Sequence, residues 1–339
     1  MIKKEDIFFN EVYWREMTPA ELDEYAHRIF DYYRQEGFPY YPTDMETRQK
    51  DFDKLMKYDR SNMWNGTDIK QTMHGLGLAW SYFPESFNVK CGNKMTPYEA
   101  FIDDEIFLKI IYKRLKMGTY ISDSGIRKML KIYSNVQSVS NFRPTAAAAI
   151  YDYFGRGTKN FTVWDMSGGW GGRMLGAIIS NVKHYTCTDP SRVAGIGLVE
   201  LREDFGSGTE IDIFNLGSED YVPDRNSLDF CFTSPPYFDL EKYSDEPTQS
   251  YIKFPEKDEW IEGFLRETFK NCYYGLKSDG AMAINIANIK GNEIESDMIR
   301  VAEECGFKFR TTFRLALSNI NLRDKTKKFK YEPIYLFTK

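Results

Sequence analysis

The chain has 339 residues, of which 42% are hydrophobic and 28% charged. This composition suits one large folded domain with a smaller partner and excludes a largely disordered protein. The net charge of −5 argues mildly against a dedicated nucleic-acid binder, since such proteins are usually basic. No apolar stretch approaches the roughly 20 residues that span a membrane, and the first ten residues turn polar too early for a signal peptide.

The cysteines and histidines predict neither disulfides nor a metal site. The five cysteines are dispersed and form no CxxC pair: Cys91, Cys187, Cys231, Cys272 and Cys305. Such a set is typical of reduced thiols in a cytoplasmic protein. The three histidines, His27, His74 and His184, show no metal-ligand spacing.

The first part of the chain, residues 1–135, is predicted to form a mainly helical domain. Thr18 and Thr96 each begin a capping box with proline at the first helical position. These signals predict one helix to about residue 35 and another that closes at Gly118. Residues 38–95 lie between them and show only weak periodicity.

Basic and aromatic stretches are candidate contacts for nucleic acid. One basic stretch precedes residue 135 and the other lies near the C-terminus: Lys109, Lys113, Arg114, Lys116, Arg127, Lys128 and Lys131, then Arg323, Lys325, Lys327, Lys328 and Lys330. Each is either a phosphate-contacting surface or a solvated helix face or loop. The aromatic stretch 38–41 would suit DNA, and would equally suit packing against the rest of the protein.

The second part of the chain, residues 136–339, alternates strands and helices. The expected strands are 161–164, 184–187, 211–214, 228–232, 281–286, 309–317 and 334–337. Helices are expected from 144, from 172 to 180, from 258 to 274 and from 295 to 305. The alternation predicts an α/β fold with a mostly parallel sheet and helices on both faces. The last two strands, joined without a helix, should pair antiparallel at the sheet edge.

A glycine-rich turn follows the first of these strands and predicts a cofactor loop. Asp165 ends the strand, and Ser167, Gly168, Gly169 and Gly171 form the turn before a helix. A strand, a glycine turn and a helix form a common nucleotide-site device, but neither the dinucleotide fingerprint nor a P-loop lysine is present. The turn therefore suits a zwitterionic sulfonium cofactor whose charged groups lie near Asp165. The alternative is a tight structural turn.

The next two strands end in residues that could complete the cofactor site. Asp189 ends the second strand, where an acidic side chain can hold a ribose diol; a turn or capping role is equally open. Ser218 begins the acidic turn 218–220 after the third strand, where a hydroxyl or acidic side chain could meet an adenine amino group.

The fourth strand runs into Thr233 and then Ser234-Pro235-Pro236-Tyr237. Two prolines fix a rigid, extended loop at the strand end where ligands bind in parallel sheets. The Ser234 side chain and the Pro235 carbonyl can accept hydrogen bonds from an amine. If the amine belongs to a nucleic-acid base, Tyr237 can stack on the ring of that base. If the reaction transfers a methyl group to the amine, no strong proton acceptor is required, provided that the proton leaves after the transfer.

Aromatic residues follow this motif. We expect Phe238 and Tyr243 to contact the substrate. The acidic, tyrosine-rich segment 239–255 is interpreted as a lid over the base pocket, with a solvated surface loop as the alternative.

These motifs resemble those of the DNA amino-methyltransferases. The segment 233–237 (TSPPY) resembles motif IV, and 165–172 (DMSGGWGG) resembles motif I, although Met166 stands where phenylalanine is common. The segment beginning at Asn141 resembles motif X, in which Pro144 and Thr145 close over the methionine part of the cofactor. Residues 217–220 stand at motif III, and 330–339 resemble the final strand.

The resemblance implies a Rossmann-like seven-stranded methyltransferase sheet that binds S-adenosylmethionine and methylates an exocyclic amino group of a base in DNA. It implies that the base flips out of double-stranded DNA, and a restriction-modification setting is expected. A serine before the prolines favours N4 of cytosine over N6 of adenine. Target recognition, if present, is expected in residues 1–135.

Three other functions stay open or are disfavoured. A methyltransferase acting on an amino or amide group of RNA or protein would keep the same motifs. A non-catalytic nucleic-acid-binding protein should have lost the glycine turn or the proline motif, and neither is lost. A dehydrogenase of the same fold class would need the dinucleotide fingerprint that is missing.

Overall fold

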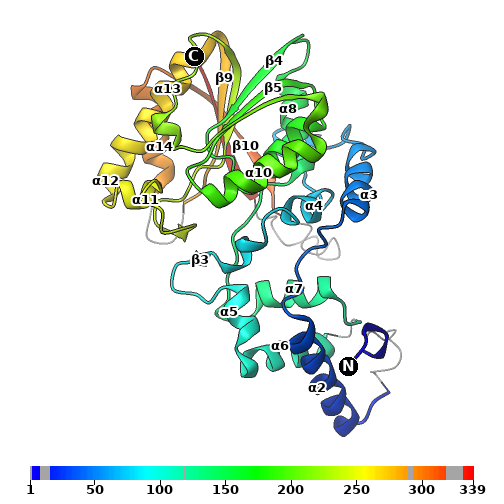
Figure 1. The fold of residues 1–339 in the computed structure, drawn as a ribbon. Helices are drawn as coiled ribbons and strands as arrows, with labels where there is room; N and C mark the ends of the chain where they lie inside the picture. Colours follow the sequence, from blue (N-terminus) through cyan, green and yellow to red (C-terminus); the bar gives the residue numbers. More distant parts are fainter. Residues whose placement is uncertain (1, 8–15, 118–119, 289–292, 318–330) are drawn as a thin grey trace. The chain divides into compact units, whose positions relative to one another are not determined.

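A computed structural model describes residues 2–7, 16–117, 120–288, 293–317 and 331–339 of the chain (Figure 1). It divides into two compact units, one formed by Met1–Pro42 and Pro84–Ser140 and the other by Thr43–Phe83 and Asn141–Lys339. The chain therefore passes between the units three times, whereas the sequence suggested a single boundary near residue 135. Residues 43–83 fold with the α/β unit.

The described elements of the first unit are almost all helical. Its main helices are α2 (Pro19–Glu36), α5 (Pro97–Ile102), α6 (Asp104–Lys116) and α7 (Asp123–Ile132), with two short 3-10 helices, Lys4–Asp6 and Pro84–Asn88, and the two-residue strand β3 (Lys90–Cys91). Their apolar faces share one core that includes Tyr33, Phe107 and Leu130. Both predicted capping boxes form, at Thr18 and at Thr96.

The single helix predicted after Thr96 is wrong, because the chain breaks at Asp103. This residue ends α5 with an extended backbone (φ −76°, ψ 111°), and its side chain accepts a hydrogen bond from the Ile106 N–H. An aspartate that caps a new helix in this way interrupts the old one. The predicted end at Gly118 lies outside the described residues.

Packing within the first unit accounts for much of its aromatic and basic sequence. Phe38 is buried beside Phe87, and the buried Arg127 donates to the carbonyl oxygens of Pro39 and Tyr40 while stacking on Tyr41. Arg114 is buried too. Two of the seven basic residues before position 135 are thus structural, and the aromatic stretch packs inside its own unit. The second basic stretch, 323–330, lies outside the described residues.

The second unit is built on a nine-stranded sheet in the order β1-β2-β10-β11-β9-β7-β4-β5-β6. The strands are β1 (Trp64–Asn65), β2 (Asp68–Ile69), β4 (Phe161–Asp165), β5 (Val182–Thr188), β6 (Glu210–Phe214), β7 (Leu228–Thr233), β9 (Leu276–Asn285), β10 (Lys308–Ala316) and β11 (Tyr331–Thr338). Strands β6, β5, β4, β7 and β9 pair in parallel. The predicted antiparallel pair is confirmed, since β11 runs antiparallel to both β10 and β9.

The expected count of seven strands is exceeded because residues 43–83 add a two-strand extension. Strand β2 pairs in parallel with β10, so β1 and β2 lengthen the sheet at its edge. The Trp64 indole N–H donates to the Ala149 carbonyl, and Arg60 pairs with Asp152 at 3.0 Å. These contacts fasten the segment to helix α8 (Pro144–Phe154). The same segment also forms α3 (Met45–Met56) and α4 (Leu76–Trp80).

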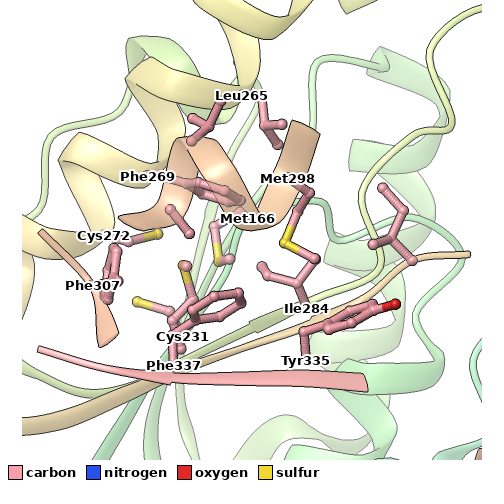
Figure 2. Close-up of a cluster of buried hydrophobic side chains, with 14 of the residues drawn as sticks. Met166, Cys231, Leu265, Phe269, Cys272, Ile284, Met298, Phe307, Tyr335 and Phe337 are labelled. Atoms are coloured by element: carbon pink, nitrogen blue, oxygen red, sulfur yellow. The ribbon is translucent and has the colours of Figure 1, made fainter. Parts of the chain in front are cut away.

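Helices cover both faces of the sheet, as predicted (Figure 1). They are α8, α9 (Gly172–Ile178), α10 (Arg192–Phe205), α11 (Ser250–Lys253), α12 (Lys257–Trp260), α13 (Glu267–Gly275) and α14 (Ile294–Glu304), with a π-helical turn, Ile261–Arg266, joining α12 to α13. On one face, α13 and α14 pack on alternate residues of β7, β9 and β11. Figure 2 shows this core, in which Cys231 and Cys272 lie among Phe269, Ile284 and Phe337.

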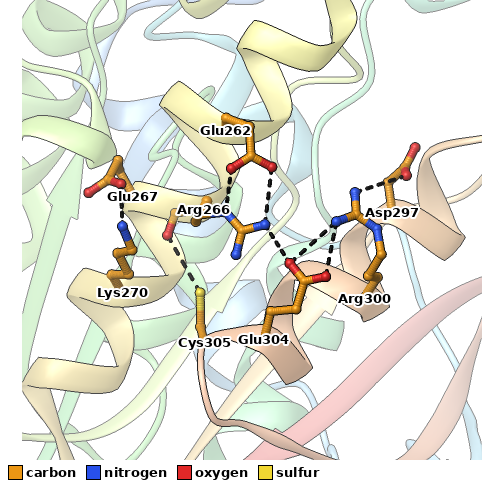
Figure 3. A network of polar contacts seen from close by, with 8 residues as sticks. All are labelled: Glu262, Arg266, Glu267, Lys270, Asp297, Arg300, Glu304 and Cys305. Carbon is orange, nitrogen blue, oxygen red and sulfur yellow. Dashed lines mark hydrogen bonds and ion pairs between the residues drawn. The ribbon is translucent and has the colours of Figure 1, made fainter.

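The outer surface of these helices carries a chain of ion pairs (Figure 3). Arg266 bonds Glu262 on its own turn and Glu304 on α14. Arg300 bonds Glu304 at 3.2 Å and Asp297 at 3.4 Å. No helix among the described residues is long and apolar enough to cross a membrane.

Candidate active site

The glycine turn forms a tight loop between β4 and α9. Gly169 and Gly171 adopt left-handed backbones, with φ of 54° and 72°, which side chains rarely tolerate. A Cβ at Gly172 would lie 2.0 Å from the Phe142 carbonyl oxygen, so the loop backbone passes directly beside the start of the motif X segment. The Gly168 N–H donates to the Thr188 carbonyl at 2.9 Å, which ties the loop to the end of β5.

The carboxylate of Asp165 lies beneath this loop and is fully buried. It accepts hydrogen bonds from Arg173 Nε at 2.8 Å and Tyr185 Oη at 2.6 Å on one oxygen. Thr233 Oγ1 at 2.9 Å and the Ser167 N–H at 3.2 Å bond the other oxygen. A buried charge is stable only when paired and hydrogen-bonded, and here the protein itself supplies those bonds. The geometry favours a role for Asp165 in fixing the loop.

Asp189 lies at the carboxyl end of β5 and faces the glycine turn. Its two oxygens accept hydrogen bonds from the Gly169 N–H at 2.8 Å and the Ser191 N–H at 3.0 Å. Burial raises the pKa of this carboxyl to about 6, although both backbone hydrogen bonds oppose the rise. The structure thus places Asp189 against the loop, and the predicted contact with a ribose stays a prediction.

Ser218 and its neighbour Glu219 lie after β6, in the 3-10 turn Ser218–Asp220. The Ser218 hydroxyl is buried and bonds Thr268 on α13 at 2.7 Å. The Glu219 side chain is almost fully buried, with one oxygen 2.9 Å from Lys253 Nζ. Its Oε2 makes no hydrogen bond to another described residue. Glu219, one of the acidic side chains of the predicted turn 218–220, therefore offers a buried acceptor with no protein donor in the described parts of the chain, whereas the Ser218 hydroxyl bonds Thr268.

Pro144 and Thr145 begin helix α8, where the motif X resemblance placed them. Both are buried, and Pro144 occupies the first turn, where a missing N–H costs nothing. The Thr145 hydroxyl lies 3.1 Å from that of Thr72, a residue of the added segment. No local pattern in the sequence indicates this partner, since 73 positions separate the two residues.

The proline motif directly follows β7. Ser234 is half-buried, Pro235 is buried, and Pro236 and Tyr237 are half-buried. Burial raises the pKa of the Tyr237 hydroxyl, while hydrogen bonds from the Ala287 backbone and the Ser234 side chain lower it. The serine and the tyrosine of the motif therefore lie together at the carboxyl edge of the sheet.

Phe238 has a left-handed backbone, with φ of 54°. A bulky residue in this region is an outlier that surrounding contacts must stabilise. Its ring packs 5.9 Å from the buried Trp260. The strain lies immediately after Tyr237, and the packing of Phe238 fixes the direction in which the chain leaves the motif.

The segment after the motif contacts the glycine turn and the residues that follow β5. The Tyr243 ring lies 6.1 Å from that of Trp170 in the glycine turn, and its hydroxyl bonds Glu241. Further along, Glu246 accepts from the Arg192 N–H at 3.3 Å, and Thr248 donates to the Pro190 carbonyl at 3.2 Å. The expected lid residues thus contact the ends of β4 and β5, and lid movement stays a prediction.

Three further polar residues, which were not predicted, lie near the proline motif: the charges of Glu332 and Glu241 act on the pKa of Tyr237, and Asn285 bonds Glu332. Asn285 ends β9, Glu332 lies at the start of β11, and Glu241 follows the proline motif. Asn285 Nδ2 donates to the Pro333 carbonyl at 3.0 Å. Among the described residues, no group of three histidines, cysteines or acidic residues could hold a metal ion.

The strand order defines the class of protein. Apart from the added β1 and β2, the sheet runs β6-β5-β4-β7-β9-β11-β10 with β11 reversed, and helices cover both faces. This is the Rossmann-like methyltransferase fold, with its ligand edge at the carboxyl ends of the parallel strands.

Comparison with known families finds a match in the second part of the chain. Residues 228–339 match the family model described as DNA methylase, which supports the resemblance to the DNA amino-methyltransferases that the motifs suggested. The predicted cofactor, S-adenosylmethionine, is the methyl donor of that family. A search of curated proteins finds no matching sequence.

Several solved structures resemble the chain at low identity. A TehB-like SAM-dependent methyltransferase from Corynebacterium glutamicum is 14% identical, with a TM-score of 0.39 over 59% of this chain and 89% of its own. Magnesium protoporphyrin IX methyltransferase from Synechocystis is 10% identical, with a TM-score of 0.40 over 57% and 78%. A putative RNA methyltransferase from Pyrococcus horikoshii is 18% identical, with a TM-score of 0.37 over 58% and 84%.

Proposed function

We propose that this protein transfers a methyl group from S-adenosylmethionine to an exocyclic amino group of a base in DNA, with N4 of cytosine favoured over N6 of adenine. One observation carries the proposal. The Ser234-Pro235-Pro236-Tyr237 motif lies at the carboxyl end of β7, inside the segment that matches the DNA methylase family.

The motif suits the chemistry of a conjugated amine. The lone pair of such an amine is delocalised into the ring, so the nitrogen must be pulled towards tetrahedral geometry before it can attack. The Ser234 hydroxyl and the Pro235 carbonyl are two acceptors on a rigid loop, which suits them to hold the two N–H bonds. Tyr237 would stack on the base, and Phe238 and Tyr243 would border it. A duplex base reaches such a site only by flipping out of the helix.

The residues around the glycine turn fit S-adenosylmethionine. Gly169 leaves room for close approach, since a Cβ built there would meet no atom nearer than 3.7 Å, and Asp189 presents a carboxylate for the ribose hydroxyls. The buried, unpartnered Glu219 Oε2 suits the adenine amino group. When bound, the cofactor supplies an activated methyl group. Asp165 would hold the loop, and Pro144 and Thr145 would border the methionine part.

Double-stranded DNA is the proposed partner, and residues 1–135 are proposed to contribute to target recognition. The exposed Lys113, Lys116 and Lys128 are the cations of the earlier basic stretch best suited to contact phosphates. A cytoplasmic restriction-modification role is proposed on the family resemblance alone.

The substrate class is tested with methyl-labelled S-adenosylmethionine and four acceptors: duplex DNA, single-stranded DNA, RNA and a protein mixture. We expect label in duplex DNA, and loss of that label in Ser234→Ala while cofactor binding persists. Label in RNA or protein alone would favour the second candidate, a methyltransferase of another amine, and would overturn the assignment to DNA.

A further inference from the structure

The register of the sheet brings a glutamate from the last strand to the proline motif. Thr233 at the end of β7 pairs with Ile284 of β9, and the next residue of β9, Asn285, pairs with Ile334 of β11. Side chains alternate between the two faces of a strand. Ser234, Asn285 and Glu332 therefore project from the same face of the sheet, at its carboxyl edge.

This face is the one that helix α8 covers. Phe232, two residues before Ser234, packs 5.3 Å from Phe142 and 5.8 Å from Tyr151 of α8. Residues of the opposite parity, such as Cys231 and Ile284, lie in the core under α13 and α14. The position of Glu332 on the α8 face thus follows from the strand register itself.

The electrostatic neighbours of Glu332 agree with this position. Burial, followed by the negative charge of Glu332, raises the pKa of Tyr237. Burial and then Glu332 also raise the pKa of Glu241. Burial raises the pKa of Glu332, against the opposing effects of a hydrogen bond from Asn285 and the charge of Arg143. The groups facing Glu332 are therefore Tyr237, Glu241, Asn285 and Arg143.

We propose that Glu332 is a catalytic residue of the amine site, which contacts the exocyclic amino group beside Ser234 and accepts the proton that this group loses. The inference rests on the proposed function. The Ser234 side chain is a hydroxyl, which cannot hold an additional proton at neutral pH. The proline motif has no carboxylate of its own. The nearby carboxylate of Glu332 supplies that missing acceptor.

The proton balance is simple. As the amine nitrogen forms its bond to the methyl carbon, the S–CH3 bond breaks and its electrons stay on sulfur. In the same step one N–H bond breaks, its electron pair stays on nitrogen, and the proton passes to a Glu332 carboxylate oxygen. Because Glu332 is only half-buried, it can return the proton to water. A carboxyl group whose pKa lies above its usual range is a better proton acceptor near neutral pH.

The test compares Glu332→Gln and Glu332→Asp with wild type. Glutamine keeps the shape but cannot take a proton, so we expect kcat on duplex DNA to fall about 100-fold. Wild-type kcat should decline as the pH falls and Glu332 becomes protonated, and Glu332→Gln should lose this decline. Glu332→Asp should retain it at a reduced rate. Affinity for S-adenosylhomocysteine, measured by calorimetry, and KM for DNA should not change.

Glu262→Gln is the matched control, since it makes the same change in the surface ion pairs of Figure 3 and should keep wild-type kcat. A Glu332→Gln enzyme with wild-type kcat and the same acid decline would overturn the role of Glu332 alone, as would an equal loss of cofactor affinity. A wild-type protein that methylates no DNA would overturn the proposed function, and the role of Glu332 with it.

Discussion

Buried carboxyl groups lie in two different environments at the carboxyl edge of the sheet, one at the glycine turn and one at the proline motif. Beneath the glycine turn, Asp165 is fully buried, yet four donors saturate its carboxylate. Beside the proline motif, Glu332 and Glu241 lie near each other, and burial raises the pKa of each. The first arrangement makes a fixed frame. The second leaves carboxyl groups that bind a proton more readily than exposed carboxyl groups do.

This contrast fits the two tasks of the site. A cofactor loop must hold its shape before the ligand arrives, and a saturated buried ion pair does that. An amine that loses a proton during the reaction needs a group whose protonation state can change. The contrast predicts stability defects from the first cluster and rate or pH defects from the second.

The largest effect is expected from Asp165→Asn, which leaves the buried Arg173 guanidinium without its partner charge. Breaking a buried ion pair in this way costs about 3–5 kcal/mol, and denaturant unfolding would measure the loss. Asp212→Asn is the control, because Asp212 pairs with His184 at 2.7 Å on a partly exposed surface. Equal, small losses for both variants would show that Asp165 does not hold the frame.

The next largest effect is expected from Ser234→Ala, which should lower the rate of methyl transfer and leave the stability of the fold unchanged. Removing one acceptor of the amine should lower kcat by about 10²-fold while cofactor affinity, measured by calorimetry, stays at the wild-type level. Thr209→Ala, which removes a buried hydroxyl distant in sequence from the motif, is the control for folding. Wild-type turnover in Ser234→Ala would refute the assignment of Ser234.

Asp189 combines features of both clusters. Its carboxylate accepts backbone hydrogen bonds, as Asp165 does, yet burial raises its pKa to about 6. If its carboxylate accepts the ribose hydroxyls, the ionised form binds best, so affinity must fall as the pH drops through that value. Calorimetry with S-adenosylhomocysteine should find binding about tenfold weaker at pH 5 than well above pH 6, which follows from the ionised fraction. Asp189→Asn should bind weakly and equally at both pH values. A pH-independent wild type would place Asp189 outside the cofactor contact.

The smallest effect is expected at the surface ion pairs of Figure 3. Glu262→Gln removes one partner of Arg266, which keeps its contact with Glu304. Exposed pairs contribute less than about 1 kcal/mol, so denaturant unfolding should barely shift. A loss of unfolding free energy as large as that of Asp165→Asn would show that buried and exposed ion pairs contribute equally to stability in this protein.

Local sequence signals predicted the parts of the site that lie on one strand and its following loop. Asp165 and Ser234 each end a buried strand, and the two capping boxes lie where expected. Residues that meet through distant pairing were missed. Thr72 lies 3.1 Å from Thr145 across 73 positions. Glu332 shares a face of the sheet with Ser234 only through the register of β9 with the reversed β11. That register depends on side-chain packing over the whole sheet, which no local pattern contains.

Burial was also beyond the sequence pattern. Arg114 and Arg127 were predicted to be surface cations. In the structure their guanidinium groups donate hydrogen bonds to backbone carbonyl oxygens inside the first unit. Ser218 was predicted to contact a ligand, and in the structure its hydroxyl bonds Thr268. In each case the polar group found a partner within the protein, as buried polar groups must.

The most direct test of the central claim is the identity of the methylated nucleoside. Unmodified duplex DNA is incubated with the protein and methyl-labelled S-adenosylmethionine, digested, and resolved by mass spectrometry. We expect label in N4-methylcytosine or N6-methyladenine, and none in a base methylated on a ring carbon. Label on a ring carbon, or DNA that stays unlabelled while RNA or protein is methylated, would contradict it.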